Sequence, residues 1–206
     1  MADQPVGQRS RRGRPRTFDR DRALDIAMRL FWRHGYEGVS LNDLTAALGI
    51  APPSLYAAFG SKAELYLAAV DRYEAISPFI EGSELADAGT LERAIHSVLT
   101  AGIDAVTRRD RERGCMVSDG LVSCGEANDG LAAHLARRRQ AMRRNLAKIF
   151  GRWLDREQAR SLARYVAALL QGISIQARDG ASAADLRPLV EIACAHGGRL
   201  SEGRRT

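Results

Sequence analysis

Glycine and proline divide residues 19–65 into a series of short helices, and this spacing constrains the fold more than any other feature. Apolar residues recur every three or four positions up to Gly35, which is the period of an amphipathic helix. The next helix is predicted to begin after the capping residue Ser40 and to end at Gly49, about two turns later. A third helix is predicted from Pro52 to Phe59, because proline fits the first turn of a helix.

A helix, a short helix, a four-residue turn and another short helix form the layout of a helix-turn-helix unit. In this layout a few apolar residues anchor the last helix, and its other side is exposed. Leu55 and Phe59 are four residues apart, so both are predicted to point inward. The residues left facing solvent are Pro53, Ser54, Ala57 and Ala58, with Tyr56 at the edge. A surface so poor in charge favours a helix that enters a groove; the alternative is a small helical subdomain with a bulky corner.

Residues 1–17 are polar and carry five arginines between Arg9 and Arg16. This composition predicts a flexible basic arm that does not fold alone. Arg12, Arg14 and Arg16 precede the helix-turn-helix pattern, and such an arm can lie in an adjacent minor groove. The net charge of +6 also favours an acidic partner, such as nucleic acid or an anionic surface. The alternative for the arm is a solubilising tail.

The rest of the chain is predicted to be helical throughout. Ser61 and Glu64 form a capping-box pattern for a fourth helix. Further helices are predicted over residues 90–109, 115–124, 130–154, 155–177 and 185–197, with Asp155 and Asp185 as caps and Gly197 and Gly198 as the last terminator. No strand-like alternation of useful length is present, so the fold class is predicted to be all-α.

Several classes of protein are excluded on sequence. No run approaches about 18 apolar residues, and the N-terminal charges precede no apolar segment, so neither a membrane span nor a secretory signal is predicted. The three cysteines are an odd number and too few for a disulfide scaffold, which makes a cytoplasmic location the expectation. Metal-ligand spacings, phosphate loops and nucleophile elbows are absent, so we predict no metal, no cofactor and no enzyme.

Residues 13–70 resemble the tetracycline-repressor (TetR) family of bacterial regulators. The matching motifs are Gly35-Tyr36, the Ser40 cap, Leu48-Gly49-Ile50, Leu55-Tyr56, Phe59 and Ser61-Lys62. The resemblance implies a homodimer that binds a palindromic operator on double-stranded DNA and represses until a small molecule binds its C-terminal domain. It also implies three parts: the basic arm (1–17), a helix-turn-helix DNA-binding domain (18–65) and a helical ligand-binding and dimerisation domain (66–206).

The resemblance also implies roles for individual residues at the DNA. Ser54 and Ala57 would face base edges beside the exposed Pro53, whereas Ser40, Tyr56 and Lys62 would hold phosphates. The predicted recognition helix departs from a common pattern, because Ser54 and Tyr56 are its only side-chain hydrogen-bond donors and a bidentate contact to guanine needs Arg or Lys. We therefore expect contacts to thymine methyls, one serine hydroxyl, and reliance on the arm and on DNA shape.

The C-terminal half carries less specific signals. The last two helices are expected to pair with those of a second protomer, although packing within one chain is the alternative. An unknown effector is expected to bind among residues 91–154. The side chains considered for its pocket are Met116, Met142, Phe150 and Trp153, all of which could instead be core residues. Arg137, Arg138, Arg139, Arg143 and Arg144 are interpreted as a solvated face, with anion binding as the alternative.

Cys115 carries the sharpest chemical hypothesis. It follows RRDRERG at the start of a predicted helix, and both features favour a thiolate that reacts with oxidants or electrophiles. The alternative is a small buried hydrophobic residue. The sequence thus predicts a transcriptional repressor that a small effector releases from its operator. The alternatives are a thiol-based sensor of oxidants or electrophiles at Cys115 and a regulator that acts mainly through protein partners.

Overall fold

The computed structural model describes residues 19–77 and 88–202, so the predicted basic arm lies outside the described residues. Every element in the described ranges is helical, which confirms the all-α prediction. The elements are α1 (Arg20–His34), α2 (Leu41–Leu48), α3 (Pro52–Phe59), α4 (Lys62–Ile76), α6 (Leu91–Thr107), the 3-10 turn η1 (Glu126–Asn128), α7 (Asp129–Phe150), α8 (Arg156–Arg178) and α9 (Ala183–Glu202). None of the described helices is long and apolar enough to cross a bilayer.

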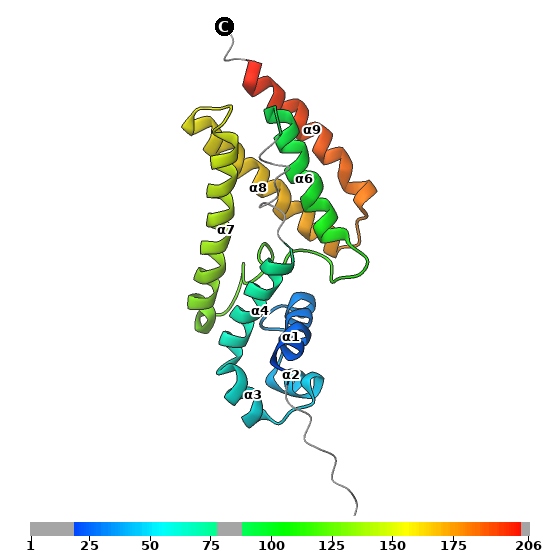
Figure 1. The fold of residues 1–206 in the computed structure, drawn as a ribbon, viewed down its shortest axis with the longest axis vertical. Helices are drawn as coiled ribbons and strands as arrows, with labels where there is room; N and C mark the ends of the chain where they lie inside the picture. The colour runs from blue at the N-terminus through cyan, green and yellow to red at the C-terminus, as the bar shows by residue number, and fades with distance from the viewer. Residues whose placement is uncertain (1–18, 78–87, 203–206) are drawn as a thin grey trace, which may run out of the picture.

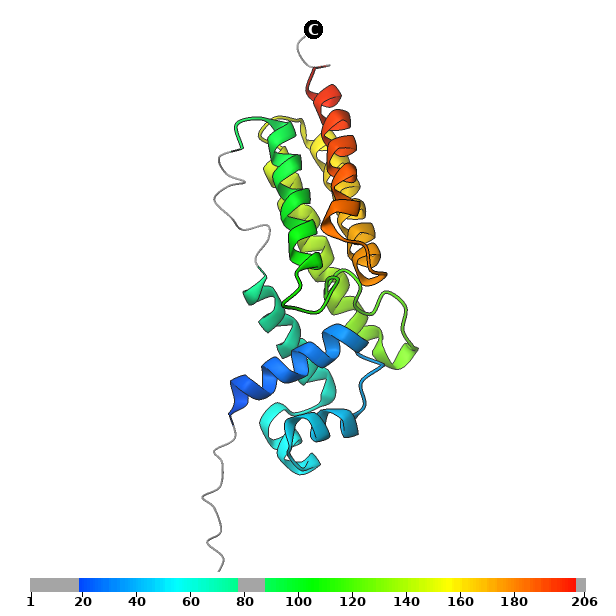
Figure 2. The same ribbon diagram turned by 90° about the vertical axis from the view of Figure 1, so that its right-hand side faces the viewer.

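The helices form two parts that lie end to end (Figure 1). Helices α1–α3 make an N-terminal unit (residues 19–60), and α6–α9 make a C-terminal bundle (residues 91–202) in which α6 packs on both α8 and α9. Helix α4 packs on α1 and leads from the N-terminal unit toward the bundle. Helix α7 packs on α8 at one end, and its other end lies beside α4 (Figure 2).

The predicted caps and apolar stripes explain why the helices of the N-terminal unit form. The Asp19 carboxylate accepts a hydrogen bond from the backbone N–H of Arg22, which satisfies a donor in the first turn of α1. One face of this helix is buried, through Ala23, Leu24, Ala27, Met28, Phe31 and Trp32. Gly35, with φ of 73°, ends the helix at the predicted residue.

The predicted helix over residues 115–124 is wrong. This stretch consists of turns, and Leu121 adopts a positive φ of 49°. Its backbone groups bond to distant side chains: the N–H of Cys115 donates to Ser174 Oγ, and the carbonyls of Val117 and Gly120 accept from Arg139. With glycine and serine lowering the helix propensity, these tertiary bonds determine the conformation.

Both predicted ends of the last helix also need correction. Ser182, not Asp185, is the cap: Ser182 Oγ accepts from the Asp185 N–H (3.3 Å), and the Asp185 carboxylate accepts from the Ser182 N–H (2.8 Å). Helix α9 then continues through Gly197 to Glu202. A Cβ on Gly197 would lie 2.2 Å from Ile95 Cδ1, so this glycine permits close packing of α9 on α6 and does not end the helix.

Candidate nucleic-acid interface

The position of α3 depends first on where α2 begins, and Ser40 caps the start of α2. Ser40 Oγ accepts from the backbone N–H of Asp43 (3.1 Å), and the Asp43 carboxylate accepts from the Ser40 N–H (2.8 Å). These bonds form a capping box around the predicted cap Ser40, and the hydrogen bonds from Ser40 lower the pKa of Asp43. Gly49 ends the helix in the left-handed region (φ of 65°), where glycine avoids the strain of a side chain. The backbone then turns into α3 at Pro52.

Helix α3 has the two faces that the sequence predicts. Leu55 and Phe59 are buried in the core, while Pro53, Ser54 and Ala57 are exposed. Tyr56 is 48% exposed, which makes it one of the most exposed large apolar side chains of the described chain. Ala58 differs from the prediction, because it is partly buried and packs against the core. The exposed face therefore offers methyl and methylene groups, one serine hydroxyl and one phenol.

Two contacts that sequence reasoning missed hold the end of α3. The Arg20 guanidinium lies 5.0 Å from the centre of the Phe59 ring, and its Nε–H donates to the Ala58 carbonyl (3.4 Å). Arg20 is 38 residues from Ala58, so no local pattern could reveal the contact. Beyond Gly60, Ser61 and Glu64 form the predicted capping box of α4. Helix α3 is thus fixed at its C-terminal end.

Lys62 lies at the edge of the same surface. Its Nζ is 4.2 Å from the centre of the Tyr36 ring, and burial lowers the pKa of this lysine while Glu37 and Asp43 act to raise it. The electrostatic interaction with Asp43 brings Lys62 near the Ser40 cap. The structure thus gathers Ser40 and Lys62, two of the predicted phosphate contacts, at one edge of the N-terminal unit.

Buried and partly buried hydrogen bonds join this unit to the C-terminal bundle. The Trp32 indole N–H donates to the Gly114 carbonyl (2.9 Å), and Arg178 Nη2 of α8 donates to the Trp32 carbonyl (3.0 Å). Gly114 belongs to the junction segment (residues 108–128), which connects α6 to α7 and includes η1. Helix α1 therefore contacts both the junction segment and the end of α8.

Asp119 is the centre of this junction. Its Oδ2 accepts from Ser174 Oγ (2.9 Å), from the Cys115 N–H (3.3 Å) and from Arg178 Nε, and its Oδ1 is buried without a hydrogen-bond partner among the described residues. The carboxylate is largely buried beside the Arg178 guanidinium, so charge and hydrogen bonding act together there. Sequence reasoning did not identify Asp119, because its side-chain partners, Ser174 and Arg178, lie more than fifty residues away.

Two of the arginines predicted to form a solvated face on α7 have structural roles instead. Arg138 forms ion pairs with Asp71 and Glu74 of α4. Arg139 Nη1 donates to the carbonyls of Val117 and Gly120, each at 2.9 Å. Helix α7 therefore holds both α4 and the junction segment.

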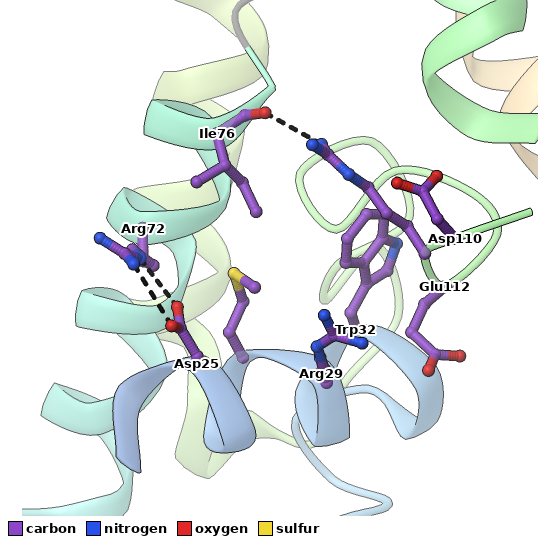
Figure 3. A pocket seen from close by; sticks show the side chains of 9 residues that line it. Asp25, Arg29, Trp32, Arg72, Ile76, Asp110 and Glu112 are labelled. Atoms are coloured by element: carbon purple, nitrogen blue, oxygen red, sulfur yellow. Dashed lines mark hydrogen bonds and ion pairs between the residues drawn. The ribbon is translucent and has the colours of Figure 1, made fainter. Parts of the chain in front are cut away.

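A cavity of about 310 Å³ opens between α1, α4 and the start of the junction segment (Figure 3). Arg72 donates to both carboxylate oxygens of Asp25 (2.8 and 3.3 Å) on one side, and Arg111 donates to the Ile76 carbonyl (2.9 Å) above. Its lining residues are Asp25, Met28, Arg29, Trp32, Arg72, Ile76, Asp110, Arg111 and Glu112. The walls carry three acids and three arginines, so the cavity has no preference for one sign of charge.

The residues considered for effector or redox sensing lie apart from this cavity. Met116 and Phe150 are fully buried in the core, and Trp153 is half-buried. Cys115 is also buried and begins no helix, and its Sγ accepts from the Ser118 N–H (3.4 Å). The preceding Arg113 donates to the Ala177 and Ala181 carbonyls, so its guanidinium is engaged at the end of α8.

Comparison with known proteins matches residues 23–69 to the model of "Bacterial regulatory proteins, tetR family". Two repressors from Escherichia coli strain K12 are similar over most of their length. HTH-type transcriptional repressor ComR is 36% identical over 88% of this chain and 89% of its own, and BdcR is 30% identical over 94% and 93%. Among solved structures, a cysteine mutant of the TetR family regulator CifR complexed with 26-base-pair operator DNA aligns with a TM-score of 0.81 and 33% identity, covering 89% of this chain and 98% of CifR.

Proposed function

The chain belongs to the TetR family of bacterial regulatory proteins and is a DNA-binding transcriptional regulator of the repressor type, and on this premise we propose that the exposed face of α3 reads its operator. The observation that carries this proposal is the contrast within α3 between its anchored and its exposed side. Leu55 and Phe59 fix the helix, and Arg20 holds its end. The other side is free to enter a major groove.

The chemistry of the exposed face defines the kind of readout. Pro53 and Ala57 offer apolar contacts that fit thymine methyl groups, and Ser54 offers one hydroxyl to a base edge. Ser40, Tyr56 and Lys62 would bind phosphates at the rim. Arg12, Arg14 and Arg16 of the arm would supply minor-groove contacts, where a narrow A·T-rich groove attracts arginine. Much of the affinity would then come from phosphates and from DNA shape.

The operator can be found by selecting bound duplexes from a random DNA pool at fixed, near-physiological salt. We expect a twofold-symmetric site whose half-sites are about 34–36 Å apart, or a multiple of this distance. If only sequence-independent, salt-sensitive binding is recovered, α3 does not read DNA. A role through protein partners would then replace the proposal.

Lys62→Gln tests the phosphate contact. Binding to every sequence should weaken, and the slope of log K against log salt should flatten by about one. The matched control is Arg93→Gln on α6, which removes the same charge from an exposed position in the bundle. An unchanged slope in the Lys62 variant would exclude the contact.

We propose that α8 and α9 form the dimer interface. Ile175 of α8 and Ile192 of α9 are 54% and 64% exposed, although both are large and apolar. Exposed apolar side chains on neighbouring helices are typical of a surface that a second protomer covers. Ile175→Asp should therefore shift the protein toward monomer in analytical ultracentrifugation, and Val122→Asp, at a 72% exposed position of the junction segment, is the control. An unchanged dimer would place the interface elsewhere.

A small effector in the C-terminal bundle would act on DNA binding through the junction segment. The side chains considered for its pocket remain Met116, Met142, Phe150 and Trp153. The bonds of Trp32, Asp119 and Arg178 link the bundle directly to α1. A displacement of the junction segment would therefore move the N-terminal unit relative to the bundle. This gives effector binding a physical route to the operator contact.

A second candidate function is thiol sensing at Cys115, which its place within the junction favours. Its N–H is bonded to Ser174, and its sulfur accepts a bond from the Ser118 N–H. An oxidised or alkylated sulfur would disturb both bonds. Treatment with hydrogen peroxide should then release operator DNA from the wild type and from Cys124→Ser but not from Cys115→Ser. Equal release from all three would exclude the sensor.

A further inference from the structure

Four arginines converge on a second cavity, between α7 and α8. Arg143 and Arg144 come from α7, and Arg160 and Arg164 come from α8, one turn apart on the same side of that helix. Gln140 and Ala147 complete the α7 side. The cavity measures about 410 Å³, which is within the range of about 300–1,000 Å³ that is usual for small-molecule sites. Its α7 residues belong to the C-terminal half of that helix (Asp129–Phe150), whose end is the one farther from α3 in Figure 1.

The charge of this cavity is unbalanced within the described residues. None of the four arginines forms an ion pair with a described carboxylate, whereas Arg138, five residues before Arg143 on α7, pairs with both Asp71 and Glu74. Like charges that share a cavity repel one another, so an anion bound between them would lower the free energy of the site. This distinguishes the cavity from the one beside Trp32, whose arginines face acids.

The side chains also determine which chemical groups the ligand must carry. A guanidinium presents paired N–H donors that match two oxygens of a phosphate or carboxylate group. Arginines from two facing helices can engage two such groups at once. The Gln140 amide can donate a further hydrogen bond, and Ala147 leaves room for the ligand between the helices.

We propose that the cavity between α7 and α8 binds a small polyanion, a molecule that carries at least two phosphate or carboxylate groups. Such a ligand would neutralise the four arginines and hold the two helices together at this point. The site is separate from the exposed face of α3, and its ligand is much smaller than DNA.

Helix α7 connects this site to the N-terminal unit. Arg138 and Arg139, which hold α4 and the junction segment, are four to six residues from Arg143 and Arg144. A ligand that shifts α7 would act on both contacts. We therefore expect the polyanion to change operator affinity, a consequence that rests on the proposed function, whereas binding itself does not.

Isothermal titration calorimetry of the full-length protein without DNA tests binding alone. Pyrophosphate and citrate are the probes, in separate titrations at low and near-physiological salt. We expect saturable binding of at least one probe, stronger for pyrophosphate if the natural ligand is a phosphate ester and for citrate if it is a polycarboxylate. The double variant Arg143→Gln/Arg160→Gln should weaken that binding by at least about tenfold, since each of its two substitutions removes one forked donor.

The matched control is Arg137→Gln with Arg93→Gln, which removes the same charge from exposed positions of α7 and α6 outside the cavity lining. It should change the affinity less than about twofold, because exposed charges at a distance are screened by salt. Arg143→Lys with Arg160→Lys keeps the charge but loses the fork, and an intermediate affinity is expected. Thermal unfolding of each variant checks that the fold is retained.

Three results would overturn the proposal. Equal weakening in the cavity variant and the control would show attraction to overall charge only. Binding that vanishes at near-physiological salt would indicate adventitious ions. Dissociation of the dimer by the cavity variant, with no effect on pyrophosphate or citrate, would show that the arginines contact the partner subunit. Failure to bind operator DNA would affect none of these readouts and would count against the proposed function alone.

Discussion

Different kinds of contact hold the N-terminal unit together with α4, on one side, and the junction segment, on the other. Helices α2 and α4 begin with capping boxes whose partners are three residues apart, Ser40 with Asp43 and Ser61 with Glu64. In the junction segment, by contrast, Gly114 bonds to Trp32 across 82 residues. Asp119 bonds to Arg178, which in turn bonds to the Trp32 carbonyl across 146 residues. The starts of α2 and α4 are therefore determined by residues close in sequence, whereas the conformation of the junction segment is determined by residues far away in sequence.

This difference has consequences for stability and for function. A capped helix keeps its start even if a distant contact is lost, because the cap belongs to the same short stretch of chain. The junction segment, by contrast, is bonded to side chains of α1, α7 and α8. A conformational change in the bundle could therefore be transmitted to the N-terminal unit through this segment. Substitutions in the two regions should therefore differ in how much they lower the free energy of unfolding and in how far along the chain they change hydrogen exchange.

The largest effect is expected at Asp119. Asp119→Ala removes the acceptor of three hydrogen bonds and leaves Arg178 beside a largely buried site without its counter-charge. We expect a loss of about 2–4 kcal/mol in the free energy of unfolding, measured by urea denaturation. Asp110→Ala is the control, because Asp110 pairs with Arg108 on the exposed surface of the same segment. A comparable loss in both variants would contradict the central role of Asp119.

A smaller effect is expected at Trp32. Trp32→Phe keeps an aromatic ring against Tyr73 but removes the N–H that donates to the buried Gly114 carbonyl. The expected cost is about 1–2 kcal/mol. Hydrogen exchange should become faster in the junction segment and stay unchanged in α2 and α3. Tyr56→Phe removes a polar group from exposed α3 and should leave the stability unaltered, so a similar loss there would remove the contrast between the two regions.

Ser61→Ala tests the local contacts. The variant loses the side-chain cap of α4, which should cost about 1 kcal/mol. Hydrogen exchange should rise in the first turn of α4 and not in the junction segment. Ser123→Ala, an exposed serine of that segment, serves as the control. Faster exchange throughout the junction segment in the Ser61 variant would mean that the two regions are not independent.

The smallest effect is a pH dependence at Glu64. Hydrogen bonds from the Ser61 backbone and hydroxyl lower the pKa of Glu64 below its ordinary value of 4.5. The carboxylate is therefore more acidic in the folded state, and its stabilising contribution is present above about pH 4.5 and is lost as the pH falls through the folded-state value. Glu64→Gln should flatten the decrease of stability between about pH 5 and pH 3. An unchanged slope in urea denaturation across this range would contradict the assignment.

Sequence reasoning located the exposed face of α3 because both of its signals are local. The four-residue spacing of Leu55 and Phe59 indicated the buried side, Gly49 marked the end of α2, and Pro52 marked the start of α3. The same reasoning failed at residues 115–124, where apolar residues suggested a helix that distant hydrogen bonds prevent. It also interpreted Gly197 as a terminator, although its role is set by Ile95 on another helix.

The sequence by itself determined the helical class, the capped helices of the N-terminal unit and the face of α3 that is exposed, because caps and periodicity act within a few residues. Only the tertiary structure decided which arginines are structural. Arg138 and Arg139 bond to α4 and the junction segment, whereas Arg143 and Arg144 line a cavity with Arg160 and Arg164 of α8. In sequence these arginines form one basic run. The partners that separate them lie on other helices, and only folding brings those helices to α7.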